Sequence, residues 1–220
     1  MTDTVAASLS KIPLFSSVDE GSLDALPGRV VRKTFRKNSI IVTEGDVSDS
    51  LYIVCSGKLK VYVGDDQGKE AILAMLTEGD YFGELAFLLE APRSASVACV
   101  EDSTLLIISR AVFEQFLAQH SEVSIALMRG LVDRVYALTS NVKSLALMDV
   151  YGRVAKLLLD VASEEDGRLI TGKMTQQDIA ERVGSSREMV SRILKELKTG
   201  GYIDQDGRCI IINKHLPARW

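Results

Sequence analysis

The stretch MTQQDIAERVGSSREMVSRILKELKTGGYI, from Met174 to Ile203, predicts two helices joined by a tight turn. Thr175 can cap the first helix, and Asp178 in its first turn completes a weak capping box. Gly184 supplies a turn residue that can adopt a positive φ. Apolar residues recur at helical spacing on both sides of this glycine, at Ile179, Val183, Val190, Ile193, Leu194 and Leu197. Together these features predict a helix-turn-helix.

The second of these helices has a polar outward face that includes two arginines, Arg187 and Arg192. Arginine can donate two parallel hydrogen bonds to guanine O6 and N7, and glutamate can accept one from cytosine N4. A capping box between Ser185 and Glu188 would explain the glutamate without DNA, but it would not explain both arginines. The face is therefore interpreted as reading bases in the major groove through Arg187, Glu188, Ser191 and Arg192.

The segments around the helix-turn-helix complete a C-terminal unit. VYGRVAKLLLDVA, residues 150–162, has helical periodicity, and SEEDG, residues 163–167, is interpreted as a surface loop. GYIDQDGRCIIIN, residues 201–213, predicts a β-hairpin with Asp206 and Gly207 at its turn.

Residues 38–110 consist of short strand-like runs punctuated by glycine. LYIVCSGKLKVYV, residues 51–63, contains two alternating runs separated by Ser56 and Gly57, and further glycine turns occur near residues 45, 64, 68 and 79. Strands of this length with turns this frequent predict an antiparallel sandwich or barrel. LSKIPLFSSVDEGSLDAL, residues 9–26, is interpreted as a short helical lead-in to it.

A long helix is predicted between these two regions. Its apolar residues alternate in steps of three and four, which is the spacing of a two-stranded coiled-coil seam. The seam positions are Ile125, Met128, Val132, Val135, Thr139, Val142 and Ala146. The seam can pair with a second copy of the chain, or the helix can pack on its own domain. Pairing is favoured because a second stripe, which the β domain could cover, is present at Leu131, Leu138 and Leu145.

Charge and composition restrict the class of protein. Residues 173–220 carry nine Lys and Arg against six Asp and Glu, so a segment of net charge +3 follows a body of −7, a distribution that is compatible with a polyanion partner for the C-terminal segment. No apolar run approaches the roughly 18 residues of a membrane span, and the first twenty residues lack a secretory signal. We therefore expect a cytoplasmic protein with no membrane partner.

The inventory of metal-binding residues is small. Cys55, Cys99 and Cys209 are far apart and form no C-x-x-C pair, and the only histidines are His120 and His215. No metal site is expected, which argues against a metal-dependent barrel enzyme of the cupin type and against a haem, redox or gas sensor. The helix-turn-helix argues against a regulatory subunit of a kinase or channel, and the chain is not expected to be an enzyme.

The order of strand-rich domain, long helix and helix-turn-helix with a hairpin resembles the Crp/Fnr transcription regulators over nearly the whole chain. SSREMVSRILKEL, residues 185–197, resembles the recognition helix of that family, and LALMDVYGRVAKLLL, residues 145–159, resembles the end of its dimerisation helix and the hinge. The resemblance implies that Arg187, Glu188 and Arg192 read a TGTGA-like half-site. It implies phosphate contacts from Thr175, Gln176 and Ser186.

GELAFLLEAPRSASV, from Gly83 to Val97, resembles the phosphate-binding cassette of the same family. Arg93 would offer forked donors to a cyclic phosphate, Ser94 would add a hydroxyl and a backbone N–H, and Glu84 would accept from the ribose 2′-hydroxyl. The alternative is an internal salt bridge between Glu84 and Arg93 that braces a loop. The cassette residues assigned to the ligand are Gly83, Glu84, Leu85, Ala86, Arg93 and Ser94.

Three residues of the long helix extend this resemblance. Arg134 matches an arginine that helps to hold the nucleotide, and Leu138 and Thr139 match two adjacent hydroxyl residues that meet the adenine. Leu138 departs from that pattern, and the cassette is one residue shorter than in the best-known enterobacterial member. The effector implied is cyclic AMP, with cyclic di-GMP or ligand-independent regulation as alternatives.

The resemblance thus implies an α+β fold: an N-terminal antiparallel β-roll that binds a cyclic nucleotide, a long dimerisation helix and a C-terminal winged helix-turn-helix. The boundaries expected are 1–120 for the β-roll, 121–148 for the helix and 149–220 for the DNA-binding domain. The function implied is that of a homodimeric, ligand-responsive transcription factor. Its expected partners are a palindromic site on double-stranded DNA and RNA polymerase, with a hinge near residues 149–152 between ligand and DNA domains.

Overall fold

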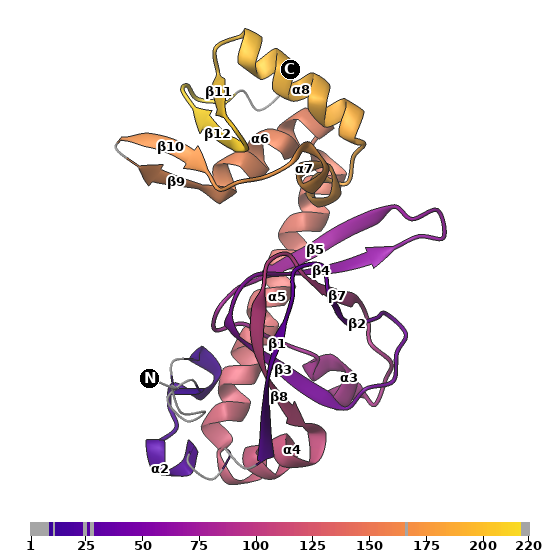
Figure 1. The fold of residues 1–220 in the computed structure, drawn as a ribbon, viewed down its shortest axis with the longest axis vertical. Coiled ribbons are helices and arrows are strands. Elements are labelled where there is room, and N and C mark those ends of the chain that lie inside the picture. The colour runs from indigo at the N-terminus through magenta and orange to yellow at the C-terminus, as the bar shows by residue number, and fades with distance from the viewer. Residues whose placement is uncertain (1–8, 11, 24–25, 27–28, 166, 217–220) are drawn as a thin grey trace. The chain divides into compact units, whose positions relative to one another are not determined.

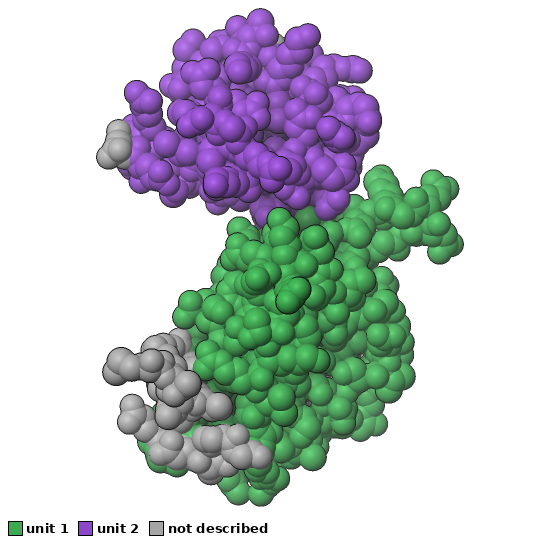
Figure 2. All heavy atoms as spheres, viewed as in Figure 1, with its two compact units in different colours: residues 1–135 green, residues 136–220 purple. Residues whose placement is uncertain are grey.

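The computed structural model describes residues 9–10, 12–23, 26, 29–165 and 167–216. The chain divides into two compact units, residues 1–135 and residues 136–220, which are distinguished by colour in Figure 2. Within the described part of the chain, no helix has the length and apolar character needed to cross a membrane.

The first unit contains two four-stranded antiparallel sheets (Figure 1). One has the order β1-β8-β3-β6, with β1 at Val30–Phe35, β8 at Ser103–Ser109, β3 at Ser50–Ser56 and β6 at Tyr81–Phe82. The other has the order β2-β7-β4-β5, with β2 at Ile40–Val42, β7 at Ser96–Cys99, β4 at Leu59–Gly64 and β5 at Glu70–Leu76. The predicted antiparallel β-roll is therefore confirmed.

Short helices accompany these sheets. They are the 3₁₀ turn η1 at Pro13–Phe15, α2 at Glu20–Leu23, α3 at Glu84–Leu89 and α4 at Arg110–Gln119. In the predicted lead-in, residues 9–26, η1 and α2 are the elements whose bounds are defined, while residues 11 and 24–25 lie outside the described residues. Residues 1–8, which are part of the twenty-residue stretch in which no secretory signal is expected, also lie outside the described residues.

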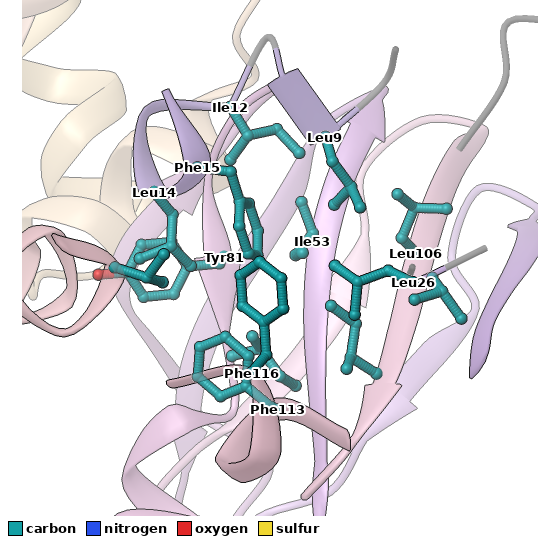
Figure 3. Packing of buried hydrophobic residues seen from close by; sticks show 14 of the residues in the cluster. Leu9, Ile12, Leu14, Phe15, Leu26, Ile53, Tyr81, Leu106, Phe113 and Phe116 are labelled. Carbon is teal, nitrogen blue, oxygen red and sulfur yellow. The ribbon is translucent and has the colours of Figure 1, made fainter. Parts of the chain in front are cut away.

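The core of the β-roll joins this lead-in to one sheet and to α4. The ring of Phe15 meets those of Phe113 and Phe116 edge-on, with centroids 6.5 and 5.8 Å apart (Figure 3). Leu9 and Ile12 are buried in the same cluster with Ile53 of β3 and Leu106 of β8. Apolar burial thus fixes the lead-in against the sheet that carries β6, which ends where the cassette begins.

The long helix α5 runs from Ser121 to Leu147. It is anchored to the β-roll core by the fully buried side chains of Val123 and Leu127. The predicted second stripe is only partly covered, because Leu131 is half-buried whereas Leu138 and Leu145 are exposed. Leu138 and Leu145 belong to the second unit, so the coverage of this stripe by the β domain stays a prediction.

The seam positions of α5 are on its surface. Ile125, Met128, Val132, Val135 and Val142 are between 47% and 64% exposed. Apolar side chains at coiled-coil spacing are thus left open within a single chain, as expected of a helix that does not bury this face on its own domain.

In the second unit, the end of α5 is followed by α6 at Val150–Val161. A helix pair follows, α7 at Gln176–Val183 and α8 at Arg187–Thr199, and both pack on α6 through one core that contains Val154, Ile179, Val190 and Leu197. A four-stranded sheet has the order β11-β12-β10-β9, with β11 at Ile203–Asp206, β12 at Cys209–Ile212, β10 at Arg168–Thr171 and β9 at Ala162–Glu165. The hairpin β11–β12 follows α8 directly, so the predicted winged helix-turn-helix is confirmed.

Two local predictions in this unit are corrected. The segment 163–167 was predicted to be a loop, but residues 163–165 belong to β9, which pairs in register with β10 from Ala162–Thr171 to Glu165–Arg168. Polar strand residues escape a prediction that relies on apolar alternation. In the β11–β12 hairpin, Asp206 still pairs with Cys209, so the turn consists of Gly207 and Arg208 rather than Asp206 and Gly207.

Candidate functional site

The predicted ligand cassette begins at the end of β6, where the backbone turns into α3. Gly83 caps this helix with φ 94 and ψ −3, a left-handed conformation that favours glycine. A Cβ at this position would overlap the Arg93 guanidinium and lie 2.7 Å from the Ser50 carbonyl oxygen. Gly83 therefore serves both the turn and the close approach of Arg93.

Arg93 is held inside the cassette, with only 4% of its surface exposed. Its Nη1 donates to Gly83 O at 2.8 Å, and its Nη2 donates to Ser48 Oγ and Ser50 O at 2.7 Å each. Its Cζ lies 5.6 Å from the centre of the Tyr52 ring. All these partners are neutral, and burial lowers the pKa of the guanidinium. Among residues whose structure is described, Arg93 thus has no carboxylate within hydrogen-bond distance, and a buried cation of this kind is well suited to receive an anion.

One donor of Arg93 is unused. Among the described residues, Nε has no hydrogen-bond partner although it is buried. The loop residue Ser48, which fixes the other end of the guanidinium, was not predicted from the sequence. The signal for it is weak, because Ser48 is separated from Arg93 by 45 residues and follows an ordinary glycine turn.

Glu84 is buried to 1% exposure, and its ion-pair partner is Arg134 of α5. The alternative of a Glu84–Arg93 salt bridge is wrong, since within the described part of the chain Glu84 pairs with the helix instead. Burial raises the pKa of Glu84, and the positive charge of Arg134 opposes that rise. Glu84 Oε1 accepts from Arg134, whereas Oε2 is buried with no partner among the described residues.

The structure brings Gly83, Glu84, Arg93 and Arg134 together, as the sequence predicted. Of the other cassette residues, Ala86 is buried, while Leu85 and Ser94 are exposed. Leu138 and Thr139 are exposed positions of α5 that belong to the second unit. Within the described residues, no group of three or more His, Cys, Asp or Glu is arranged to hold a metal ion.

The helix-turn-helix is defined by its caps. The predicted capping box of α7 is confirmed, because Asp178 N donates to Thr175 Oγ1 at 3.1 Å and Thr175 N donates to Asp178 Oδ2 at 2.7 Å. Gly184 ends α7 with φ 64 and ψ 48. These caps fix where α8 begins relative to α7.

The N-cap of α8 is Ser186, whose Oγ accepts from Met189 N at 3.2 Å. The alternative of a capping box between Ser185 and Glu188 is therefore wrong, since Glu188 lies one position too early to pair with this cap. Contact with its own backbone N–H and with the Ser186 hydroxyl lowers the pKa of Glu188, so the carboxylate is charged at neutral pH.

The predicted base-reading residues lie on the outer side of α8. Arg187, Glu188 and Arg192 are exposed and Ser191 is half-buried, while the opposite face buries its apolar residues. The predicted phosphate contacts are also accessible, with Ser186 exposed and Thr175 and Gln176 half-buried. α8 thus has the amphipathic form that a groove-reading helix needs.

Comparison with known proteins assigns both units. Residues 32–120 match the model of the cyclic nucleotide-binding domain, and residues 152–215 match that of the Crp-like helix-turn-helix domain. The chain is 31% identical over 210 residues to the CRP-like cAMP-activated global transcriptional regulator of Mycobacterium tuberculosis, covering 93% of this chain and 94% of that protein. The chain belongs to the Crp/Fnr family.

Other members of the Crp/Fnr family agree with this assignment. The cAMP-activated global transcriptional regulator Vfr of Pseudomonas aeruginosa is 34% identical over 198 residues, or 86% of this chain and 92% of Vfr. The fold matches that of CLP from Xanthomonas campestris, described as a c-di-GMP responsive global regulator, with a TM-score of 0.79 at 24% identity over 89% of this chain and all of CLP. This Crp/Fnr protein is therefore a transcription regulator with a cyclic nucleotide-binding domain and a DNA-binding domain.

Proposed function

We propose that this regulator binds a cyclic nucleotide in the cassette and, as a homodimer, a palindromic promoter site through α8. The single observation that supports the ligand proposal is a pair of buried atoms that have no partner in the part of the chain that the structure describes. Arg93 Nε is an unused donor with positive charge, and Glu84 Oε2 is an unused acceptor with negative charge. Buried polar atoms of this kind are costly to leave unpaired.

A cyclic nucleotide offers the complementary groups. Its phosphate carries one negative charge on two exocyclic oxygens that can accept from Arg93 Nε, and its ribose 2′-hydroxyl can donate to Glu84 Oε2. The hydroxyl of Ser94, which is exposed, can add a donor to the phosphate. Leu85, Ala86, Arg134, Leu138 and Thr139 complete the proposed ligand set. Cyclic AMP is the proposed effector, because the two relatives compared above, at 31% and 34% identity, are cAMP-activated regulators.

Dimerisation is proposed through the exposed seam of α5. A second copy offers the same apolar face with the same spacing, and a parallel pair of such helices would bury both. A symmetric dimer would present two copies of α8, which suits a palindrome whose half-sites are one helical turn apart. RNA polymerase is proposed as the further partner of the DNA-bound dimer.

The break between α5 and α6 is the proposed hinge. Asp149 caps α6 by accepting from Gly152 N at 2.7 Å, and Arg153 donates to Met148 O at 2.9 Å. Ligand contacts on α5 can shift the arrangement of the DNA-binding domains only by the difference in affinity for the two arrangements. If the ligand-free protein bound its operator as tightly as the liganded protein at matched salt, this gating would be refuted.

Isothermal titration calorimetry with cyclic AMP, cyclic GMP and cyclic di-GMP tests the proposed ligand. The wild type is expected to bind cyclic AMP, and Arg93→Gln is expected to lower the affinity at least tenfold, on the order of a lost charge-assisted hydrogen bond. Arg110→Gln is the matched control, because Arg110 pairs with Glu90 and Glu114 on the surface of the same domain. Unchanged affinity in Arg93→Gln would refute the anion site, and binding of cyclic di-GMP alone would replace the proposed effector.

A further inference from the structure

Gly130, in the middle of α5, lies directly against the hydroxyl of Tyr81. A Cβ at Gly130 would overlap the Tyr81 hydroxyl oxygen and lie 3.2 Å from its Cζ. The Tyr81 ring is buried in the core of the β-roll (Figure 3), and its hydroxyl donates to Leu127 O at 3.5 Å. The missing side chain of Gly130 is therefore what allows α5 to approach this ring.

The same face of α5 also carries Arg134. Leu127, Gly130 and Arg134 are spaced by three and four residues, so they lie on one side of the helix. Arg134 donates to the backbone oxygen of Tyr81 and to Glu84, and its Cζ is 4.7 Å from the centre of the Tyr81 ring. Tyr81 is thus in contact with α5 at its hydroxyl end and at its backbone end.

Backbone conformation does not require glycine at this position. Gly130 is not among the glycines with positive φ, and it lies well inside a helix of 27 residues. Glycine is one of the poorest helix formers, so alanine would favour the isolated helix. Neither backbone conformation nor helix propensity explains the glycine at position 130, whereas the close contact with Tyr81 does.

We propose that Gly130 is a positioning residue of the nucleotide site, which lets α5 sit close enough to Tyr81 for Arg134 to hold the Glu84 carboxylate. Arg134 occupies Oε1 and thereby orients Oε2, the oxygen assigned to the ribose 2′-hydroxyl. The inference rests on the proposed function for the identity of the ligand, but the contacts of Tyr81 with Gly130 and Arg134 are made by the protein's own residues.

The first test measures the Glu84 carboxyl without ligand. The full-length protein is labelled with ¹³C at glutamate carboxyls, the Glu84 signal is assigned with Glu84→Gln, and its pKa is read from an NMR titration. The groups that act on Glu84 include Arg134 and Arg93, both of which lower its pKa against the effect of burial. In Gly130→Ala the pKa of Glu84 is expected to rise, because Arg134 is displaced while the carboxyl stays buried.

Tyr81→Phe in the Gly130→Ala background provides the rescue. It removes the oxygen that the new methyl group would overlap, so the pKa of Glu84 is expected to return toward the wild-type value. Ser140→Ala, an exposed substitution on the same helix, is the control and is expected to leave this pKa unchanged. An unchanged pKa in Gly130→Ala, or no recovery in the double variant, would overturn the inference.

The second test uses calorimetry with cyclic AMP and with its 2′-deoxy analogue. Gly130→Ala is expected to lower the affinity for cyclic AMP about tenfold, the factor that corresponds to roughly one hydrogen bond to a charged group. The affinity for the deoxy analogue is expected to fall much less in this variant, because the analogue makes no 2′-hydroxyl contact with Glu84. Equal losses for both nucleotides would overturn the inference. If the wild type bound neither, the proposed function would fail, and the Glu84 titration would still decide the role of Gly130.

Discussion

Replacement of Val142 by glutamate tests whether the seam of α5 joins two copies of the chain. Val142 is 64% exposed in the single chain. Complete burial of a valine side chain stabilises by about 2 kcal/mol, so covering the exposed part contributes roughly 1.3 kcal/mol in each copy. The symmetric dimer contains this contact twice, which gives about 2.5 kcal/mol, or a dissociation constant raised roughly 70-fold on substitution. Two like charges facing each other across the seam would raise it further.

Sedimentation equilibrium of the full-length protein measures this change. Wild type is expected to be dimeric at micromolar concentration, and Val142→Glu is expected to dissociate over the same range. Ala137→Glu is the matched control, because it places the same charge at an exposed position on the other side of the helix. The reasoning is refuted if Val142→Glu has the dissociation constant of the wild type, or if both variants weaken the dimer equally.

Three further substitutions follow from the described contacts. Because burial raises the pKa of Glu84 in the folded chain, the folded state holds this proton more tightly than the unfolded state. The free energy of unfolding of wild type, relative to that of Glu84→Gln, is therefore expected to fall as pH rises above 4.5. Urea unfolding of both proteins at a series of pH values measures this difference, and a difference that does not change with pH would contradict the reasoning. Gly184→Ala should lower the free energy of unfolding by about 1 kcal/mol, because the backbone φ at Gly184 is 64. Gly172→Ala, at an open position without positive φ, should change this free energy little, and equal effects of the two substitutions in thermal unfolding would contradict the reasoning. Arg192→Ala should weaken binding to a TGTGA-type palindrome more than binding to random DNA, because base contacts rather than phosphate contacts carry specificity. A fluorescence anisotropy titration measures both affinities, and equal losses would indicate a phosphate contact.

Local features of the sequence predicted much of the fold. The capping box of Thr175 and Asp178, the glycine at the end of α7 and the apolar stripe of α8 are each encoded within a few residues, and all three are present in the structure. The antiparallel strands of the β-roll were visible for the same reason, because alternation and glycine turns are local signals.

Predictions that depended on choosing between neighbouring residues were less reliable. Ser185 and Ser186 are equally good capping residues in the sequence, and the path of the chain after Gly184 decides that Ser186 is the cap. The polar strand β9 has no apolar alternation, and it exists because it can pair with β10. Leu138 and Leu145 have the spacing of a stripe that could be covered, yet both side chains are exposed in the structure.

The sequence by itself determined which residues of the cassette carry charge and that a glycine must precede them. Only the tertiary structure decided their partners. Arg93 binds Ser48 in a distant loop and Ser50 at the start of β3, and Glu84 binds Arg134 from a helix 50 residues further on. The physical reason is that a buried charge takes the partners that folding brings within hydrogen-bond distance, and closing long loops brings together residues whose spacing in the chain contains no signal of the contact.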